Sequence, residues 1–399
     1  MSQGPDLYDP DWYVDGPVHE TFAELRRTEP VRWQDIPGDT GYWAVLRHAD
    51  VVHVARHPEV FSAWEGGVVL ETLEGEGLDQ MRHMLLAMDP PRHTAYRQPL
   101  APHFGARVIG RMEEQIRGRC RAILDAAAGR DEVDLCHDVA GPLPAQVIGE
   151  LMGLPAEDTA QIQRWAELQT SVQDEEVTAG YEGNPSMEMA VYGMAWAATR
   201  REQPRRDDIT ALLLESTFED GQPMTDVDFG SFFVQLVTAG NDTTKTMLAG
   251  GTFELLRHPD QLRALREDPS LLPGAVEEVL RWCNPLHYFR RTASIDVELG
   301  GQQVRAGDKV AMIYTSANRD EEAFAEADRF DIRRNPNPHL SFGIGAHFCL
   351  GAHLARLEAR IFFEELLSTF STIELAGEPA RVRSNLNNGF KRLPVRLRP

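Results

Sequence analysis

The chain has 399 residues, of which 42% are hydrophobic, and a formal net charge of -22. Such an acidic chain has no general attraction to nucleic acid or to an anionic membrane surface. The N-terminus lacks a basic stretch followed by an apolar one, and no apolar run reaches the roughly 18 residues of a membrane span. We therefore expect a cytoplasmic protein without a membrane anchor. No linker or repeat divides the sequence, which predicts one domain over residues 1–399.

The first elements in chain order mix strand and helix. Residues 41–58 alternate like a strand and then become helical, and Pro58 follows the end of that helix. Residues 63–88 contain several glycines without a sustained period, which is typical of a loop with short helical pieces. From Pro90 onward most of the sequence is helix-like.

The clearest helices are 107–129 and 225–258. The second has a cap in Thr225-Asp226, ends before Pro259, and is apolar over much of its middle, which indicates a helix through the core. Residues 290–314 carry the turn signals of small hairpins. An irregular stretch then leads into a helix over 352–370. The sequence predicts a mainly α protein with a minor β part.

The four cysteines, Cys120, Cys136, Cys283 and Cys349, show neither disulfide nor zinc spacing. The first three lie in helical or apolar stretches, where packed thiols are expected. Cys349 instead precedes a helix and follows a glycine-rich loop, whose N–H groups favour a thiolate. From this pattern alone Cys349 is a metal ligand, a nucleophile or a buried thiol. A cysteine hydrolase would need a base, and His347 is too constrained to act as one.

The stretch from Phe342 to Gly351 resembles the haem-binding loop of the cytochrome P450 family, F-x-x-G-x-x-x-C-x-G, at Phe342, Gly345, Cys349 and Gly351. The resemblance implies the P450 fold, with the long core helix over a haem b whose iron is bound by Cys349. It also implies a monooxygenase with O2 as co-substrate, because a proximal thiolate favours O–O cleavage.

A second constellation lies in the long helix at residues 239–244. Ala239 and Thr243 are four residues apart and share a face; the threonine hydroxyl can bond back to the i−4 carbonyl, and Gly240 is expected to open room on that side. Alone, this pattern fits a solvated helix face equally well. It resembles the family's oxygen-binding motif, A-G-x-[D/E]-T-[T/S]. The resemblance implies that Asp242 delivers protons and that Thr243 steadies the oxygen intermediate.

Glu278 and Arg281 are three residues apart on a predicted helix, where such a pair is usually a weak surface ion pair. They resemble the family's E-x-x-R motif, which joins a later arginine in a buried structural network. Arg329 matches that third position. We expect these residues to support the haem side without taking part in catalysis.

A haem also needs donors for its two carboxylates. By resemblance these are His93 and Arg97 on one helix, Arg291 after the E-x-x-R helix, and His347 beside the cysteine. The remaining residues of the expected cofactor-binding set come from the two motifs above: Ala239, Gly240, Phe342 and Gly351.

The chain contains no sequence like a flavin or iron–sulfur domain. The resemblance therefore implies a ferredoxin and an NAD(P)H-dependent ferredoxin reductase as partners. Between residues 92 and 130 there are eight arginines and no lysine, against Glu113, Glu114 and Asp125. We expect these arginines, with Arg356 and Arg360, to form a basic face for an acidic ferredoxin.

The expected substrate pocket is mostly apolar, which favours an apolar small molecule. Its segments, placed by resemblance, are Trp64, Val68, Val69, Leu70 and Met84, then 237–239, 286–289 and 386–390. Some of these segments resemble relatives that act on sterols, terpenes and branched lipids. Two alternatives remain at this point: another oxidation, such as epoxidation, desaturation or phenol coupling, and a non-catalytic haem sensor.

Overall fold

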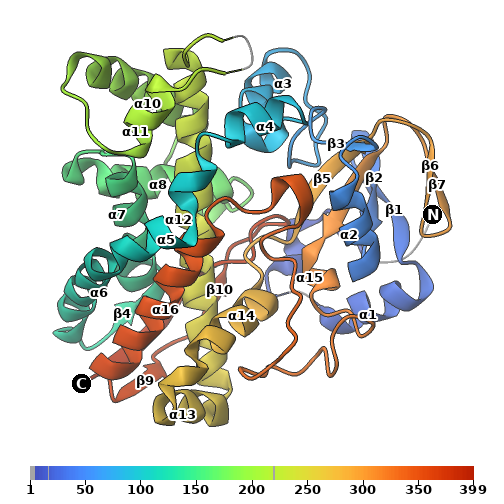
Figure 1. The fold of residues 1–399 in the computed structure, drawn as a ribbon. Coiled ribbons are helices and arrows are strands. Elements are labelled where there is room, and N and C mark those ends of the chain that lie inside the picture. Colours follow the sequence, from blue (N-terminus) through green and yellow to red (C-terminus); the bar gives the residue numbers. More distant parts are fainter. Residues whose placement is uncertain (1–4, 17, 219–220) are drawn as a thin grey trace.

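The computed structural model describes residues 5–16, 18–218 and 221–399. Most of its helices lie in one half of the molecule, whereas the largest sheet lies in the other half with α1 (His19–Thr28) and α2 (His48–Arg56) (Figure 1). The remaining helices are α3 (Gly75–Arg82), α4 (Arg92–Arg97), α5 (Ala106–Ile109), α6 (Glu113–Ala128), α7 (Pro142–Leu151), α8 (Thr159–Thr170), α9 (Glu175–Thr178), α10 (Pro185–Glu202), α11 (Ile209–Glu215), α12 (Asp226–Arg257), α13 (Pro259–Glu267), α14 (Leu272–Cys283), α15 (Tyr314–Ala317) and α16 (Ala352–Thr369). The predicted mainly α fold with a minor β part is confirmed.

The long helix α12 runs through the helical half, as predicted. Thr225 caps it: its hydroxyl accepts from the Asp228 backbone N–H, and the Asp228 carboxylate accepts from the Thr225 backbone N–H. The helix ends at Arg257, immediately before His258 and Pro259. Its neighbours are α7, α8, α10, α14 and α16. Because it is covered on so many sides, the helix is largely apolar before and after the polar run 241–246.

The largest sheet has five strands in the order β1 (Val31–Ile36), β2 (Asp39–Val45), β8 (Lys309–Ile313), β5 (Tyr288–Ala293) and β3 (Phe61–Ser62). Only β2 and β8 pair in parallel. A hairpin of β6 (Val297–Leu299) and β7 (Gln302–Val304) separates β5 from β8. It turns at Gly300 and Gly301, whose φ angles of 55° and 81° explain the glycines.

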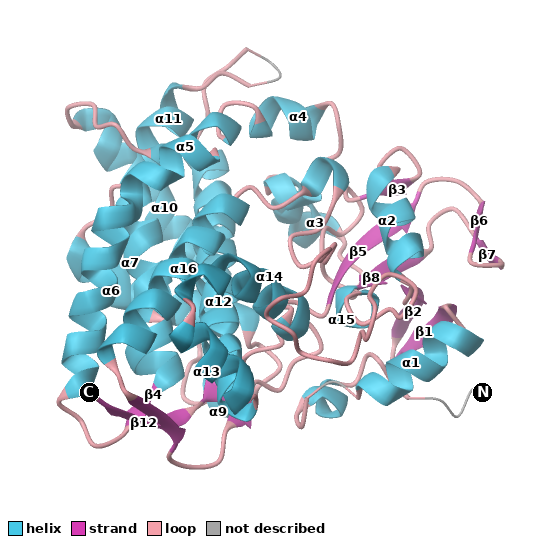
Figure 2. Ribbon diagram, turned by 60° about the horizontal axis from the view of Figure 1, so that its bottom comes forward, coloured by secondary structure: helices cyan, strands magenta, loops and turns pink. Residues whose placement is uncertain are grey.

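The C-terminal part adds two small sheets to the helical half (Figure 2). One pairs β12 (Pro394–Arg398) with β4 (Val133–Asp134) and with β9 (Thr372–Leu375), and the other pairs β10 (Ala380–Arg381) with β11 (Phe390–Arg392). Alternation in the sequence did not identify these strands because they are two to five residues long. Among the described residues, no helix has the length and apolar character needed to cross a membrane.

The loop over 63–88 contains the expected short helical pieces, α3 and a single 3-10 turn over Leu85–Ala87. The predicted helix 107–129 is divided into α5, a 3-10 turn over Gly110–Met112, and α6. The break coincides with Gly110, a residue that weakens a helix interior.

Candidate active site

The loop from Phe342 to Gly351 joins the sheet half to α16. It is closed by the Cys349 backbone N–H, which donates to the Phe342 carbonyl at 2.8 Å. Gly345 has a φ of 79°, and a Cβ atom there would lie 2.5 Å from the carbonyl oxygen of Ala55 at the end of α2. Only glycine fits this position, so the motif glycine allows close contact with α2.

Cys349 differs from the other three cysteines in being only partly buried. Burial raises the pKa of its thiol, although the Gly351 backbone N–H, Arg97 and Arg356 act in the opposite direction. The Gly351 N–H therefore favours the thiolate, as expected of the loop, but burial of the sulfur outweighs this effect. The charge of a bound metal ion would provide the missing stabilisation, because a coordinating thiol is deprotonated.

Ala239 and Thr243 lie on one face of α12. Ala239 is exposed and Thr243 is half-buried, in contrast to the buried residues that follow them. The Thr243 hydroxyl donates to the Ala239 carbonyl at 2.6 Å, the back-bond that the spacing predicts. Gly240 does not share this face: a Cβ atom there would lie 3.3 Å from Ile148 of α7. Its small size serves helix packing, which corrects the expectation that it opens room beside Thr243.

Asp242 is 3% exposed and lies on the side of α12 that faces α8 and the segment before β11. Its Oδ2 atom accepts hydrogen bonds from the Thr170 hydroxyl at 2.8 Å and from Asn387 Nδ2 at 2.6 Å. Its Oδ1 atom lies 2.5 Å from Nζ of Lys245. The acid and the alcohol of the motif are therefore neighbours in sequence that face different surroundings.

The four expected carboxylate donors come from three separate elements. The rings of His93 and His347 are 4.3 Å apart, and the Nε2 atom of each is buried without a hydrogen-bond partner among the described residues. Arg97 donates from Nη2 to the Phe348 carbonyl at 2.5 Å, and Arg291 is 5% exposed in β5.

Two of these four groups, Arg97 and Arg291, give the region a positive potential that disfavours charged histidines. Burial, together with Arg97 and Arg291, lowers the pKa of His93 to about 4. Burial, Arg291, His93 and Arg97 lower the pKa of His347 to about 2. Buried donors without acceptors, beside two arginines, are the complement of a dianionic group. The residues present therefore fit the two carboxylates of a haem, and the sulfur of Cys349 would be available to bind its iron.

The E-x-x-R pair is fully buried. Arg281 donates from Nε and Nη2 to both oxygens of Glu278, at 2.8 Å and 2.7 Å. The third member is Arg334, whose Nε atom is 3.1 Å from Glu278 Oε2. The prediction of Arg329 is wrong: its guanidinium pairs with Glu326 and is 57% exposed, and only its backbone carbonyl accepts from Arg281 and Arg334. Two arginines five residues apart cannot be distinguished by spacing alone.

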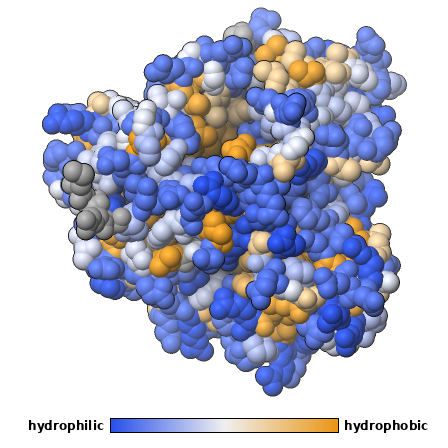
Figure 3. Space-filling view, turned by 180° about the vertical axis from the view of Figure 1, so that it is seen from behind, coloured by the Kyte–Doolittle hydropathy of each residue, from blue (hydrophilic) through white to orange (hydrophobic). Residues whose placement is uncertain are grey.

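Sequence reasoning also missed Lys245 and Glu167, which lie beside Asp242. Lys245 lies three residues after Asp242 in a polar run of α12, and that spacing was its only signal. Of the expected pocket residues, Leu70 packs in the core of the sheet half, and His287 is 1% exposed with its Nδ1 atom 2.8 Å from the Thr315 hydroxyl. Figure 3 shows a hollow with hydrophobic residues around it on the face opposite that of Figure 1.

Comparison with known proteins defines the class. Residues 187–396 match the family model for cytochrome P450, and the chain belongs to the cytochrome P450 family. It is 38% identical to a steroid C26-monooxygenase of Mycolicibacterium smegmatis over 389 residues, which cover 95% of this chain and 90% of the relative. It is 37% identical to a methyl-branched lipid omega-hydroxylase of Mycobacterium tuberculosis, with 96% and 92% covered. It is 36% identical to a linalool 8-monooxygenase of Pseudomonas putida, with 99% of both covered.

Among solved structures, a Mycobacterium marinum cytochrome P450 in complex with pseudoionone superposes with a TM-score of 0.91. That protein is 35% identical, and both chains are covered completely. The fold is thus the P450 fold, and the protein is an oxidoreductase, a monooxygenase whose cofactor is haem b and whose co-substrate is O2. The alternatives of a cysteine hydrolase and a non-catalytic haem sensor are set aside.

Proposed function

We propose that the substrate of this monooxygenase is a sterol, a terpenoid or a methyl-branched lipid, which it hydroxylates at a C–H bond. The observation that carries the proposal is the agreement of three relatives, each about 36–38% identical, whose names specify a steroid, a methyl-branched lipid and linalool. All three are largely apolar. The apolar residues of the pocket expected from the sequence support the same substrate class.

A ligand screen tests this proposal. The ferric protein would be titrated with a sterol ketone, a methyl-branched fatty acid and linalool, and the spin-state change of the haem recorded. Turnover with the ligands that bind should then give a product heavier by one oxygen atom. If none of the three shifts the spectrum while a chemically different molecule does, the substrate class is wrong. A product lacking the added oxygen would favour desaturation or coupling.

We propose that residues 1–399 act as one haem-thiolate domain in the cytoplasm. Cys349 would bind the iron within the loop that Phe342 and Gly351 delimit, and His93, Arg97, Arg291 and His347 would hold the haem carboxylates. The haem would supply dioxygen activation. Ala239 would then be the small residue of α12 that allows the helix to lie close to the cofactor, which its exposure supports.

We propose that Asp242 delivers the protons for this reaction and that the Thr243 hydroxyl would hold the dioxygen in place. Asp242→Asn should slow turnover on the order of 100-fold, the usual contribution of a positioned acid. It should leave the spectrum of the reduced carbon monoxide complex unchanged, because the thiolate ligand is not altered. Unchanged turnover would remove Asp242 from the mechanism.

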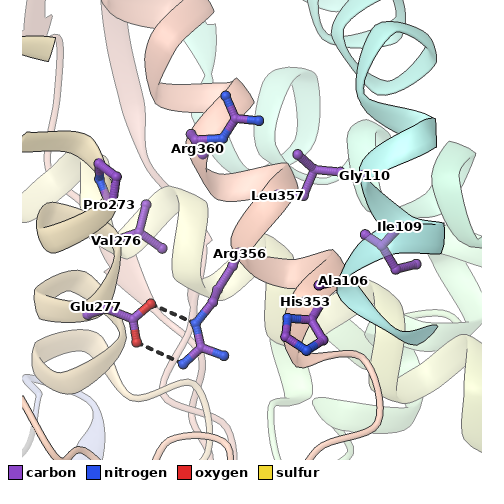
Figure 4. Close-up of a pocket in the computed structure, with 10 residues that line it drawn as sticks. All are labelled: Ala106, Ile109, Gly110, Pro273, Val276, Glu277, His353, Arg356, Leu357 and Arg360. Carbon is purple, nitrogen blue, oxygen red and sulfur yellow. Dashed lines mark hydrogen bonds and ion pairs between the residues drawn. The ribbon is translucent and has the colours of Figure 1, made fainter. Parts of the chain in front are cut away.

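We propose that electrons come from an acidic ferredoxin, reduced by an NAD(P)H-dependent reductase, that binds beside α16. A groove of about 240 Å³ lies there between the ends of α5, α14 and α16 (Figure 4). The basic face expected over 92–130 is largely neutralised: Arg117, Arg121 and Arg130, like Arg356 and Arg360, pair with acids of this chain. Arg107 and Arg111 are exposed and flank the groove residues Ala106 and Gly110, so they are the better candidates.

Charge reversal tests the docking site. Arg107→Glu with Arg111→Glu should weaken the apparent affinity for ferredoxin and remove most of its dependence on ionic strength. Arg206→Glu with Arg305→Glu is the matched control, because it also reverses two exposed arginines, one between α10 and α11 and one between β7 and β8. Equal effects of the two reversals would show that only overall charge matters.

A further inference from the structure

Lys245 is a buried cation in the middle of the core helix. It is 4% exposed, and its Nζ atom lies between two carboxylates, 2.5 Å from Asp242 Oδ1 and 3.3 Å from Glu167 Oε1 of α8. Burial by itself lowers the pKa of Lys245, but Asp242 and Glu167 raise it overall. The lysine is therefore charged, and it is held by two acids instead of one. A buried ion pair costs desolvation energy, which an apolar core would not require.

The second acid, Glu167, connects this pair to the surface. Arg164 Nη1 lies 3.1 Å from Glu167 Oε2, and His137 Nδ1 lies 3.7 Å from Glu167 Oε1. The side chains of Arg164 and His137 are 42% and 45% exposed. Burial raises the pKa of Glu167, whereas Lys245, His137 and Arg164 lower it further, so that it is ionised. Ionisable groups thus follow one another without a break from solvent to Asp242.

The carboxylate of Asp242 is held at both oxygens. Lys245 lies at Oδ1, and Thr170 and Asn387 donate to Oδ2. The other titratable group packed against this cluster is the thiol of Cys136, which burial keeps protonated by raising its pKa. None of these partners belongs to the Ala239–Thr243 face. The Asp242 carboxylate consequently faces the ionisable groups that lead to solvent. Its side chain would have to rotate to reach the Ala239–Thr243 face.

We propose that Lys245 and Glu167 form a relay that recharges Asp242 with protons from solvent, entering at His137. His137 first passes a proton to the Glu167 carboxylate. Lys245 then donates one N–H proton to the Asp242 carboxylate and takes the proton from Glu167 in its place. The charge of the lysine is the same before and after, and one proton moves inward. Both are positioning residues for Asp242, and the relay rests on the proton-delivery role proposed for that acid.

Two variants test the relay in the complete ferredoxin-driven enzyme. Glu167→Gln keeps the shape and the hydrogen bond to Lys245 but cannot carry the proton, and Lys245→Met removes the central group. Both should lower product formation on the order of ten-fold, increase the kinetic solvent isotope effect, and divert reducing equivalents to peroxide. The buried Arg200–Asp208 ion pair contains none of the relay residues and provides the control, because Arg200→Met removes a comparable pair while leaving Glu167, Lys245 and Asp242 in place.

A spectroscopic measurement separates the relay from a structural role. Without Lys245, two buried carboxylates lose their shared cation, so one of them should bind a proton at neutral pH. The infrared spectrum of the ferric Lys245→Met protein should then show an additional carboxylic acid band, which Asp242→Asn in the same background removes. The Arg200→Met protein should not show the carboxylic acid band that Asp242→Asn removes.

The outcomes are distinguishable. If Glu167→Gln retains the wild-type isotope effect and product yield while Asp242→Asn does not, Asp242 delivers protons by another route and the relay is wrong. If Asp242→Asn is also without effect, the proposed role of Asp242 fails instead. If Lys245→Met does not fold, Glu167→Gln alone decides the question, because it keeps every hydrogen bond to the lysine.

Discussion

Arg334 Nε lies 3.1 Å from Glu278 Oε2, and this contact, not one from Arg329, completes the buried network behind the cysteine loop. Arg334→Ala should therefore lower the free energy of unfolding by about 3–5 kcal/mol, the usual cost of leaving a buried charge unpaired. Arg329→Ala, in an exposed pair, should change it by less than about 0.5 kcal/mol. Urea unfolding followed by circular dichroism would measure both. Equal losses would contradict the assignment.

Cys349 should be the only cysteine that determines the haem spectrum. Cys349→Ser should abolish the strongly red-shifted Soret band of the reduced carbon monoxide complex, because that shift requires a thiolate ligand. Cys283→Ala is the matched control; it removes a buried thiol from α14 and should leave the band in place. A red-shifted band in the serine variant would remove Cys349 from the iron.

His93 and His347, whose Nε2 atoms lack a hydrogen-bond partner in the described part of the chain, should govern how firmly the haem is held. His347→Leu or His93→Leu removes a donor to a charged group worth about 1.5–3 kcal/mol, so haem should be lost roughly 10- to 100-fold faster. Transfer to a haem-free globin acceptor measures this rate. His353→Leu, an exposed histidine on α16, should leave it unchanged. A similar loss from all three variants would indicate a general loss of stability.

His287 should make stability fall in acid. Burial lowers its pKa to about 3 from an ordinary value of 6.5, with Arg381 adding to the effect. Between these values the unfolded chain binds a proton that the folded chain does not, so stability is full above pH 6.5 and decreases as the pH falls towards 3. His287→Asn should reduce that slope by about one proton, whereas His103→Asn, at an exposed position, should not. Denaturant midpoints over the pH range provide the measurement.

What the sequence predicted well depends on local or continuous patterns. The helix over 226–257 has its own cap and a long apolar run, and the hairpins near Gly300 have their own turns, so neither depends on distant residues. The cysteine loop is equally recognisable, because all its defined positions lie within ten residues.

What it did not predict depends on tertiary packing. Arg329 and Arg334 both lie near the place in the sequence where the third member of the E-x-x-R network is expected. Only the fold of the chain determines which guanidinium reaches Glu278. Gly240 has two neighbouring surfaces to face, and the packing of α7 decides between them. The pairing of Lys245 with Glu167 joins residues 78 positions apart, for which periodicity gives no signal.

The contact of Gly345 with the Ala55 carbonyl has a consequence for biogenesis. It joins parts of the chain that are about 290 residues apart, and contacts of such high contact order form slowly because a long loop must close first. The cysteine loop therefore cannot take up its final shape until residues 342–351 have been synthesised and can reach α2. We expect cofactor incorporation to come after that point, so a cell that overproduces this protein would accumulate a colourless precursor whenever haem synthesis lags behind translation.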